Sequence, residues 1–187
     1  MRRQRPPHPT GRSVLPDRPI RNVHERWLAA PADVVWDLLG EIGQDSDAVW
    51  PHRNWPPMKL DGPLRVGAAG GHSAVRYRCT AMVPRRLIEF TFDDIGGRRL
   101  DGHHAFELLD RRGGTLLRHT IDAQVADRKG TWWFRVFVQP THDVVVEELF
   151  QTIESRLAQS ECAPPRWSPW VRLLRRRRGL PTRPQRG

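Results

Sequence analysis

Three of the chain's eight histidines lie within one short stretch, DGHHAFELLDRRGGTLLRH, residues 101–119. A neutral imidazole offers one hydrogen-bond donor and one acceptor, and its pKa near neutrality lets it exchange a proton. The stretch is typical of a β-hairpin, and a turn within RRGG pairs residues whose numbers sum to 225. In that register His104 and His119 share a face with Phe106, while His103 points away. We therefore expect His104 and His119 to be diagonal neighbours, roughly 7–8 Å apart, on a buried face.

Histidines in such a position can serve two purposes. His104 and His119 could fix a ligand or move a proton, which makes them the candidate catalytic groups. Alternatively, they are ordinary interior histidines, each bonded to a neighbour or to water. Tyr77 could offer its hydroxyl to the same interior or simply pack there. His142 lies at the expected start of the last helix, where the helix dipole favours a neutral imidazole. We expect no metal ion and no cofactor, because no paired-ligand motif joins these histidines.

Hydrophobic periodicity indicates the elements that must position these side chains. Apolar residues recur at helical spacing in two segments and at alternate positions in others, which predicts helices and antiparallel strands with one buried face. The expected strands are 21–29, 75–83, 87–93, 103–110 and 115–125, and the expected helices are 30–42 and 139–158.

Three connecting segments are less regular. The Pro-rich residues 49–64 indicate an ordered loop or a short helix, and the glycines before His72 a flexible turn or a cavity rim. Residues 131–138, TWWFRVFV, fit either a strand end or a helical piece bent at Pro140. In the second half of the chain, Thr141 or Asp143 would cap the last helix.

Alternate strand residues and the apolar stripe of the last helix would meet inside the sheet. From these faces we predict the following ligand-binding residues: Tyr77, Phe90, Phe92, His104, Phe106, His119, Ile121, His142, Val146 and Phe150.

The chain has 187 residues and a net charge of +10, but the basic residues are concentrated at its ends. Residues 1–21 carry six arginines and one acidic residue, and residues 160–187 carry eight and one. The middle, 22–159, has a net charge of −2, so a basic nucleic-acid groove across the folded domain is not expected. We predict a disordered Arg/Pro-rich tail at 1–20, one domain at 21–158 and an Arg-rich tail, also disordered, at 159–187.

The C-terminal tail contains apolar residues beside a cationic block, WSPWVRLLRRRRGL, a combination that suits a membrane surface. The residues expected to make that contact are Trp167, Trp170, Arg175, Arg176, Arg177 and Arg178. The alternatives are a solvated extension without a partner, or a protein or nucleic-acid partner. Two cysteines form no disulfide framework, and neither a secretory signal nor a membrane span is evident. We expect a cytoplasmic protein, with peripheral membrane contact as a variant.

Several segments resemble the SRPBCC superfamily, which includes START-type lipid-transfer proteins and polyketide cyclase/dehydrases. They are AAPADVVWDLL, WPPMKLDGPLRVGAAGGHSAVRYRC, DGHHAFEL, LLRHTIDA and PTHDVVVEELF, within about residues 21–158. The Trp-Pro-Pro and Gly-Gly-His segments are similar to an uncharacterised bacterial subgroup. The resemblance implies an α+β helix-grip fold, in which a curved antiparallel sheet wraps round a long C-terminal helix and leaves a cavity for an apolar molecule.

Fold membership leaves the function open, since binders, carriers and cyclases share this architecture. We expect a protein that binds or carries a small hydrophobic, lipid- or polyketide-like molecule. One alternative is an aromatase/cyclase-type polyketide cyclase/dehydrase that uses cavity His and Tyr side chains as acid–base groups. The other is a scaffold whose cavity is filled by its own large side chains.

Overall fold

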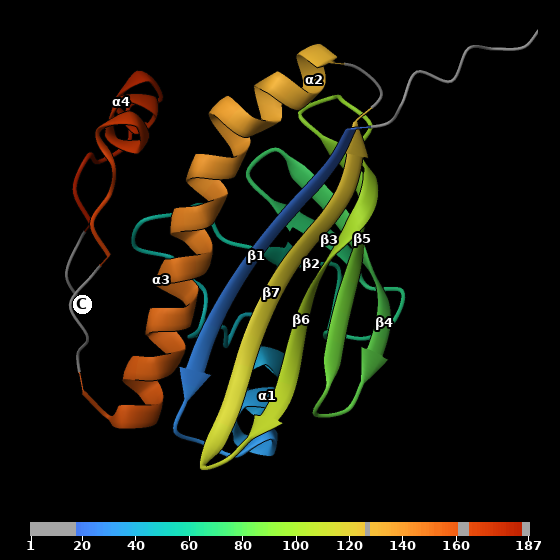
Figure 1. Cartoon of the computed structure of the whole chain (residues 1–187), viewed down its shortest axis with the longest axis vertical. Helices are drawn as coiled ribbons and strands as arrows, with labels where there is room; N and C mark the ends of the chain where they lie inside the picture. The colour runs from blue at the N-terminus through green and yellow to red at the C-terminus, as the bar shows by residue number, and fades with distance from the viewer. Residues whose placement is uncertain (1–17, 126–127, 161–164, 185–187) are drawn as a thin grey trace, which may run out of the picture.

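A seven-stranded antiparallel sheet and a long helix form the body of the protein (Figure 1). The computed structural model describes residues 18–125, 128–160 and 165–184. The strands are β1 (Arg18–Leu28), β2 (Lys59–Leu60), β3 (Ala69–His72), β4 (Val75–Val83), β5 (Leu87–Ile95), β6 (Asp101–Arg111) and β7 (Gly114–Val125). The helices are α1 (Ala32–Gly40), α2 (Arg128–Trp133), the π-helix η1 (Phe134–Val138), α3 (Gln139–Ala158) and α4 (Pro169–Arg177).

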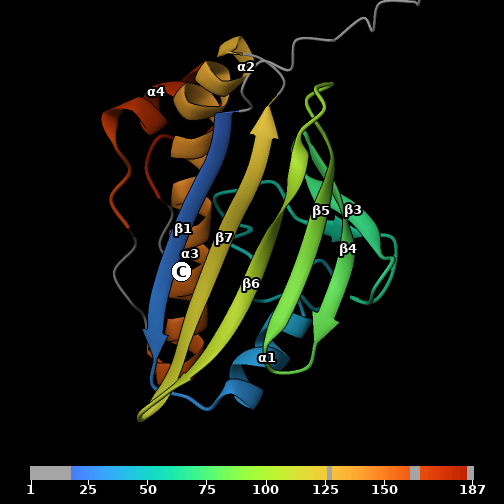
Figure 2. The ribbon, with the colours of Figure 1, turned by 45° about the vertical axis from the view of Figure 1, so that its right-hand side comes forward.

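The strand order is β1-β7-β6-β5-β4-β3-β2, so the chain's first strand lies at one edge, beside its last. The sheet curves, and α3 runs along one of its faces (Figures 1 and 2). This arrangement confirms the predicted α+β helix-grip fold. Residues 1–17 of the predicted N-terminal tail lie outside the described residues, and the domain boundaries stay predictions.

The β6–β7 hairpin has the predicted register. Phe106 pairs with His119 and His104 with Ile121, as the sum of 225 requires. His104 and His119 are buried, whereas the side chain of His103 on the opposite face is 43% exposed. Alternation of apolar residues was sufficient to fix this pairing, because a slip by one residue would turn every apolar side chain to solvent.

The last helix begins earlier than its apolar stripe predicts. α2, η1 and α3 follow one another without a break, so the helical interpretation of residues 131–138 is right. Pro140 therefore lies inside the helix, and neither Thr141 nor Asp143 caps it. His142 does not lie at a helix N-terminus either, which removes the dipole argument for its neutral form.

The proline nevertheless leaves a gap in the helical hydrogen bonding. Pro140 has no N–H to give to the carbonyl of Val136, four residues earlier. The N–H of Gln139 bonds back to the carbonyl of Phe134, the five-residue step of a π-helix. The indole Nε1 of Trp170, on α4, donates to the carbonyl of Val136 at 2.7 Å. A side chain from the C-terminal segment thus supplies the donor that the proline lacks.

The C-terminal segment is ordered over residues 165–184, which corrects the expectation of a disordered tail there. Ser168 caps α4 by accepting from the N–H of Val171, and Pro169 occupies the first turn. Trp167, Val171 and Arg175 recur at helical spacing and are buried. This helix lies beside α3, away from the strands (Figure 1).

A buried carboxylate on α3 explains this attachment. Glu148 accepts hydrogen bonds from the indoles of Trp55 and Trp167, at 2.9 and 2.5 Å, and from the amide of Asn54 at 3.0 Å. The guanidinium of Arg175 lies 4.5 Å from the ring centre of Trp55 and 4.3 Å from that of Trp167. Trp167 and Arg175 are therefore turned into the protein, which corrects the expectation that they face a membrane.

Candidate functional site: an apolar cavity with buried imidazoles

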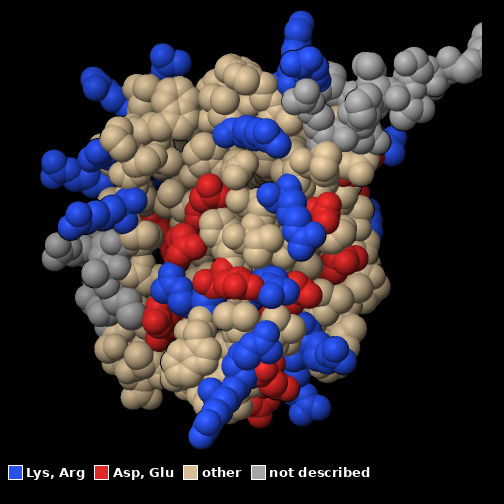
Figure 3. Space-filling view, viewed as in Figure 1, with Lys and Arg blue, Asp and Glu red and all other residues tan. Residues whose placement is uncertain are grey.

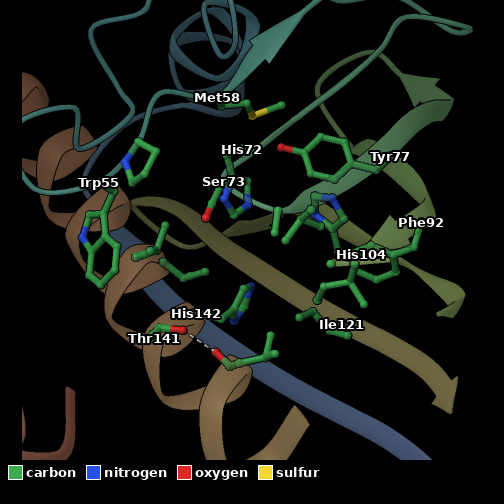
Figure 4. A pocket seen from close by; sticks show the side chains of 18 of the residues that line it. Trp55, Met58, His72, Ser73, Tyr77, Phe92, His104, Ile121, Thr141 and His142 are labelled. Carbon is green, nitrogen blue, oxygen red and sulfur yellow. Dashed lines mark hydrogen bonds between the residues drawn. The ribbon is translucent and has the colours of Figure 1, made fainter. Parts of the chain in front are cut away.

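A cavity of about 230 Å³ lies between the sheet and α3. Most of its wall is apolar, with aromatic and aliphatic side chains from the sheet, from η1 and α3, and from the loop around Trp55. Side chains of His72, Tyr77, His104 and His142 enter this space from different elements (Figure 4). A concave, mostly apolar space with a few convergent polar groups is the usual form of a small-molecule site.

Eight of the ten residues predicted to bind a ligand line this cavity. They are Tyr77, Phe92, His104, Phe106, His119, Ile121, His142 and Val146. Phe90 and Phe150 instead pack in the core behind the wall, 1% and 0% exposed. Phe90 stacks on the ring of His104 at 5.0 Å and holds it in place rather than facing the cavity.

The buried imidazoles form a pair. Nδ1 of His104 lies 3.3 Å from Nε2 of His119, a hydrogen bond that needs a single proton between the two rings. The other ring nitrogens, Nε2 of His104 and Nδ1 of His119, have no hydrogen-bond partner among the described residues. The hydroxyl of Tyr77 and Nδ1 of His142 are likewise buried without such a partner. A buried polar atom without a hydrogen-bond partner lowers the stability of the folded state by about 1–3 kcal/mol. These atoms therefore destabilise the protein unless another group bonds to them.

Burial keeps the polar groups of the cavity uncharged at neutral pH. It lowers the pKa of His104 and of His119 well below the ordinary value, and the nearby His142 adds to the effect. Burial also lowers the pKa of His72 and of His142, and it raises the pKa of the Tyr77 hydroxyl. The cavity therefore suits a neutral molecule that donates and accepts hydrogen bonds.

The tautomers of the pair are linked. If His104 donates to His119, then Nε2 of His104 is left as an acceptor and Nδ1 of His119 as a donor. If His119 donates, the two roles are exchanged. In both states the neutral pair offers one donor and one acceptor, which is the arrangement needed to give and take a proton on one ligand.

An ion-pair network on the outer side of His142 joins β1 to α3. Nδ1 of His24 lies 2.9 Å from Glu147 and its Nε2 lies 3.1 Å from Asp143. Burial lowers the pKa of His24, but these carboxylates outweigh it and the net shift is upward. Ring centres of His119 and His142 are 5.1 Å apart, and those of His142 and His24 are 6.0 Å apart. A row of imidazoles thus runs from the cavity to the partly exposed carboxylates.

This network is also the place where described residues could share a metal ion. Donor atoms of His24, His142 and Asp143 all lie within 4.8 Å of one another. However, both ring nitrogens of His24 are bonded to carboxylates, and the Asp143 oxygen also accepts from Asn22 at 3.0 Å. The geometry is that of a satisfied ion-pair network, and we assign no metal to it.

Sequence reasoning missed part of the cavity wall. His72 ends β3 and lines the cavity, 4.8 Å from the ring of Trp50, which favours the cavity-rim interpretation over a flexible turn. The glycines before it belong to a strand because the neighbouring backbone approaches closely: a Cβ on Gly70 would lie 2.0 Å from the carbonyl of Lys59. Phe137 was missed because residues 131–138 were ambiguous between strand and helix.

The cavity opens between four segments. Its exposed lining residues are Pro56, the β3–β4 turn at Ser73 and Ala74, Gly96 after β5, and Arg178 at the end of α4. Leu180 lies beside Arg178 in the wall. The C-terminal segment therefore contributes to the rim of the cavity, and Arg178 is a cationic side chain there.

No protein-family model and no curated protein matches this chain. Solved structures do resemble it. Norcoclaurine synthase from Thalictrum flavum, in complex with dopamine and hydroxybenzaldehyde, has a TM-score of 0.60 at 10% identity, covering 87% of this chain and 100% of that one. CalU16 from Micromonospora echinospora has a TM-score of 0.51 at 19% identity, with 78% and 86% covered. An uncharacterised protein from Rhizobium leguminosarum has a TM-score of 0.52 at 19% identity, and the likeness covers 77% of this chain and 97% of that one.

These likenesses show that the chain has the Bet v1/SRPBCC-type helix-grip fold. Identities below one fifth do not carry an activity from one protein to another. Membership of the SRPBCC superfamily therefore stays a prediction.

Proposed function

We propose that this protein binds a small, largely apolar molecule that carries a hydroxyl or carbonyl group. The observation that supports this most directly is the set of buried polar atoms without a partner, on Tyr77, His104, His119 and His142, around an apolar space. A ligand with a single polar group would satisfy some of these atoms while its apolar part fills the cavity. A scaffold with a filled interior is not supported, since about 230 Å³ stays open.

The size of the cavity favours a compact ligand. Sites for drug-sized molecules span about 300–1,000 Å³, and this cavity, at about 230 Å³, is below that range. It suits a molecule of one or two rings better than a diacyl lipid or a long poly-β-keto chain. That norcoclaurine synthase was solved with dopamine and hydroxybenzaldehyde indicates that a protein of this fold can hold single-ring molecules.

Two probes that differ by a single hydroxyl group test the hydrogen bond between the ligand and the cavity side chains. We expect the protein to bind 2-naphthol more tightly than naphthalene, by about two- to twelvefold, because one neutral hydrogen bond contributes about 0.5–1.5 kcal/mol. In a Tyr77→Phe/His104→Phe double variant this preference is expected to fall, because only His119 and His142 keep an unpartnered polar atom, while naphthalene still binds. Fluorescence titration measures both affinities.

The matched control is His103→Gln, which changes the adjacent histidine on the opposite face and should leave both affinities unchanged. Binding of neither probe to the parent protein would refute the cavity site. An unchanged ratio in the double variant would refute the role of these two side chains. Native mass spectrometry of protein purified from its own host would then report the mass of the natural ligand.

Acid–base catalysis is a second candidate, favoured by the linked donor and acceptor of the His104–His119 pair. One ring could remove a proton next to a ligand carbonyl while the other protonates its oxygen, and the proton between the rings would shift to restore balance. A positioned acid or base typically contributes about 10²–10⁴-fold in rate. The row from His119 to His24 would allow exchange of protons with solvent.

This second candidate predicts exchange at an activated carbon. In deuterium oxide, 1-tetralone is expected to exchange its α-protons faster with the parent than with His119→Leu, as followed by proton NMR. His103→Gln should exchange at the parental rate. Equal rates for parent and His119→Leu would leave binding alone as the function.

A further inference from the structure

An exposed surface beside the cavity opening combines aromatic and basic side chains. Its exposed apolar members are Trp132, Trp170 and Leu173, with the half-buried Phe137 in contact with both indoles, and its basic members are Arg128, Lys129, Arg135, Arg172, Arg176 and Arg177. We call this surface, formed by α2, η1 and α4, the aromatic–basic patch. Trp132 is 60% exposed, Leu173 40% and Trp170 37%. None of the described helices is both long and apolar enough to cross a bilayer.

The aromatic members of the patch are held together although they come from distant parts of the chain. The rings of Trp132 and Phe137 are 5.7 Å apart, and those of Phe137 and Trp170 are 6.0 Å apart. The bond from Trp170 to the carbonyl of Val136 fixes α4 against η1. The patch is therefore a built surface and not a loose tail.

Its charge differs from that of the rest of the body. Residues 128–138 and 165–184 contain no Asp or Glu, whereas residues 22–159 have a net charge of −2 even with Arg128, Lys129 and Arg135 included. In Figure 3 the Lys and Arg side chains over α4 and α2 have few Asp or Glu neighbours, whereas over β1 and α3 basic and acidic side chains are mixed. A surface of one sign attracts a partner of the opposite sign.

We propose that the aromatic–basic patch docks on the surface of an anionic phospholipid bilayer. Tryptophan prefers the boundary between headgroups and acyl chains, and each Lys or Arg close to an anionic leaflet adds about 1 kcal/mol, about fivefold in affinity. The patch also adjoins the cavity: Phe137 belongs to both, and Arg178 at the cavity rim follows Arg177 of the patch. A small apolar molecule dissolved in the bilayer would meet the opening directly.

Vesicle flotation with the full-length protein tests this surface. We expect binding to vesicles of phosphatidylcholine mixed with phosphatidylglycerol, weakened by added salt, and little binding to phosphatidylcholine alone. Arg176→Ser/Arg177→Ser should lower the partition coefficient about 25-fold, and Trp132→Ser about fivefold or more. All of these side chains are exposed, so folding should be unaffected.

Two control variants match these changes at the other end of the molecule. Arg111→Ser/Arg112→Ser removes two exposed arginines from the β6–β7 hairpin, and Trp27→Ser removes an indole that is 50% exposed on β1. Both are expected to float like the parent. The basic residues 1–17 remain in every variant, so their attraction to the vesicles cancels in the comparison.

Equal flotation of patch and control variants would overturn the proposal, as would absence of flotation with anionic vesicles. Binding of a short DNA duplex that is lost in the patch variants, without vesicle binding, would assign the patch to nucleic acid instead. The naphthol assay tests the cavity separately, because it is carried out without vesicles and the patch substitutions leave the cavity polar groups intact.

Discussion

Acidification from pH 6.5 to pH 5 is expected to lower the free energy of unfolding through His104 and His119 alone, by at most about 3 kcal/mol, the limit for two rings that stay neutral in the native state. Both are buried, and burial holds their pKa values well below the ordinary value of 6.5. Below pH 6.5 the unfolded chain takes up a proton at each imidazole and the native state does not. Each such site lowers stability by up to about 1.4 kcal/mol per pH unit.

Other titrating groups do not reverse this trend. The pKa values of His72 and His142 are also lowered by burial and act in the same direction. The pKa of His24 is raised, so its contribution is fully present in acid and is lost only as the pH rises. The pKa of Asp143 is lowered, and its contribution is lost only below about pH 4. Burial raises the pKa of Glu148, so acidification stabilises the native state at this carboxyl group. That effect opposes the loss at the histidines, but it comes from one group only.

Denaturant unfolding at several pH values measures this dependence. His103→Gln, the exposed neighbour, should keep the parental slope, and His104→Phe/His119→Leu should flatten it. If the double variant does not fold, the prediction is tested on the parent protein instead, by following the protonation of its histidine rings with NMR. The rings of His104 and His119 should remain neutral at a pH at which the unfolded chain is protonated. Titration of either ring near its ordinary pKa would contradict the prediction.

Replacing Glu148 by alanine is expected to cost about 3–5 kcal/mol and to release the C-terminal segment. The substitution leaves the indoles of Trp55 and Trp167 and the amide of Asn54 without their shared acceptor. It also leaves the buried guanidinium of Arg175 without its carboxylate counter-charge. The remaining partners of Arg175, the two indole faces and the carbonyl of Pro181, do not balance its charge.

Two measurements separate local from global effects. Denaturant unfolding reports the loss of overall stability, and brief trypsin digestion reports local unfolding of α4, which makes the backbone after its arginines accessible to the protease. Glu154→Ala is the matched control: its ion pair with Arg26 is partly exposed and contributes at most about 1 kcal/mol. If Glu148→Ala behaves like this control in both assays, the carboxylate does not hold the segment.

Five of the seven strands, β1 and β4 to β7, and most of the cavity face could be predicted from the sequence because they follow from alternation, whereas the short strands β2 and β3 were missed. The hairpin register depends on where Phe106, Leu108 and their partners lie, and a slip of one residue would have exposed them all. The position of His104 and His119 as diagonal neighbours on the buried face then followed without any knowledge of tertiary structure. The 3.3 Å separation of their ring nitrogens could not be predicted, because it depends on side-chain rotamers fixed by Phe90 and Tyr77.

The C-terminal half was harder to predict for a physical reason. Residues 131–138 are apolar except for Thr131 and Arg135 and are rich in β-favouring aromatic and β-branched residues, so their period did not separate strand from helix. In α4, Ser168 before Pro169 and Gly179 after the last turn were helix signals. The density of arginines there favoured a solvated tail. That Arg175 is buried depends on a carboxylate 27 positions earlier, which no local pattern indicates.

The indole of Trp170 bonds to the carbonyl of Val136 within the same helical turn whose Phe137 and Val138 line the cavity. Whatever occupies the cavity and favours this turn also favours attachment of the terminal helix. By thermodynamic reciprocity, a ligand that strengthens this attachment is itself bound more tightly, by the same factor, when the terminal helix is attached. Because Pro140 leaves the carbonyl of Val136 free for Trp170, ligand binding in the cavity and attachment of the terminal helix act on the same helical turn.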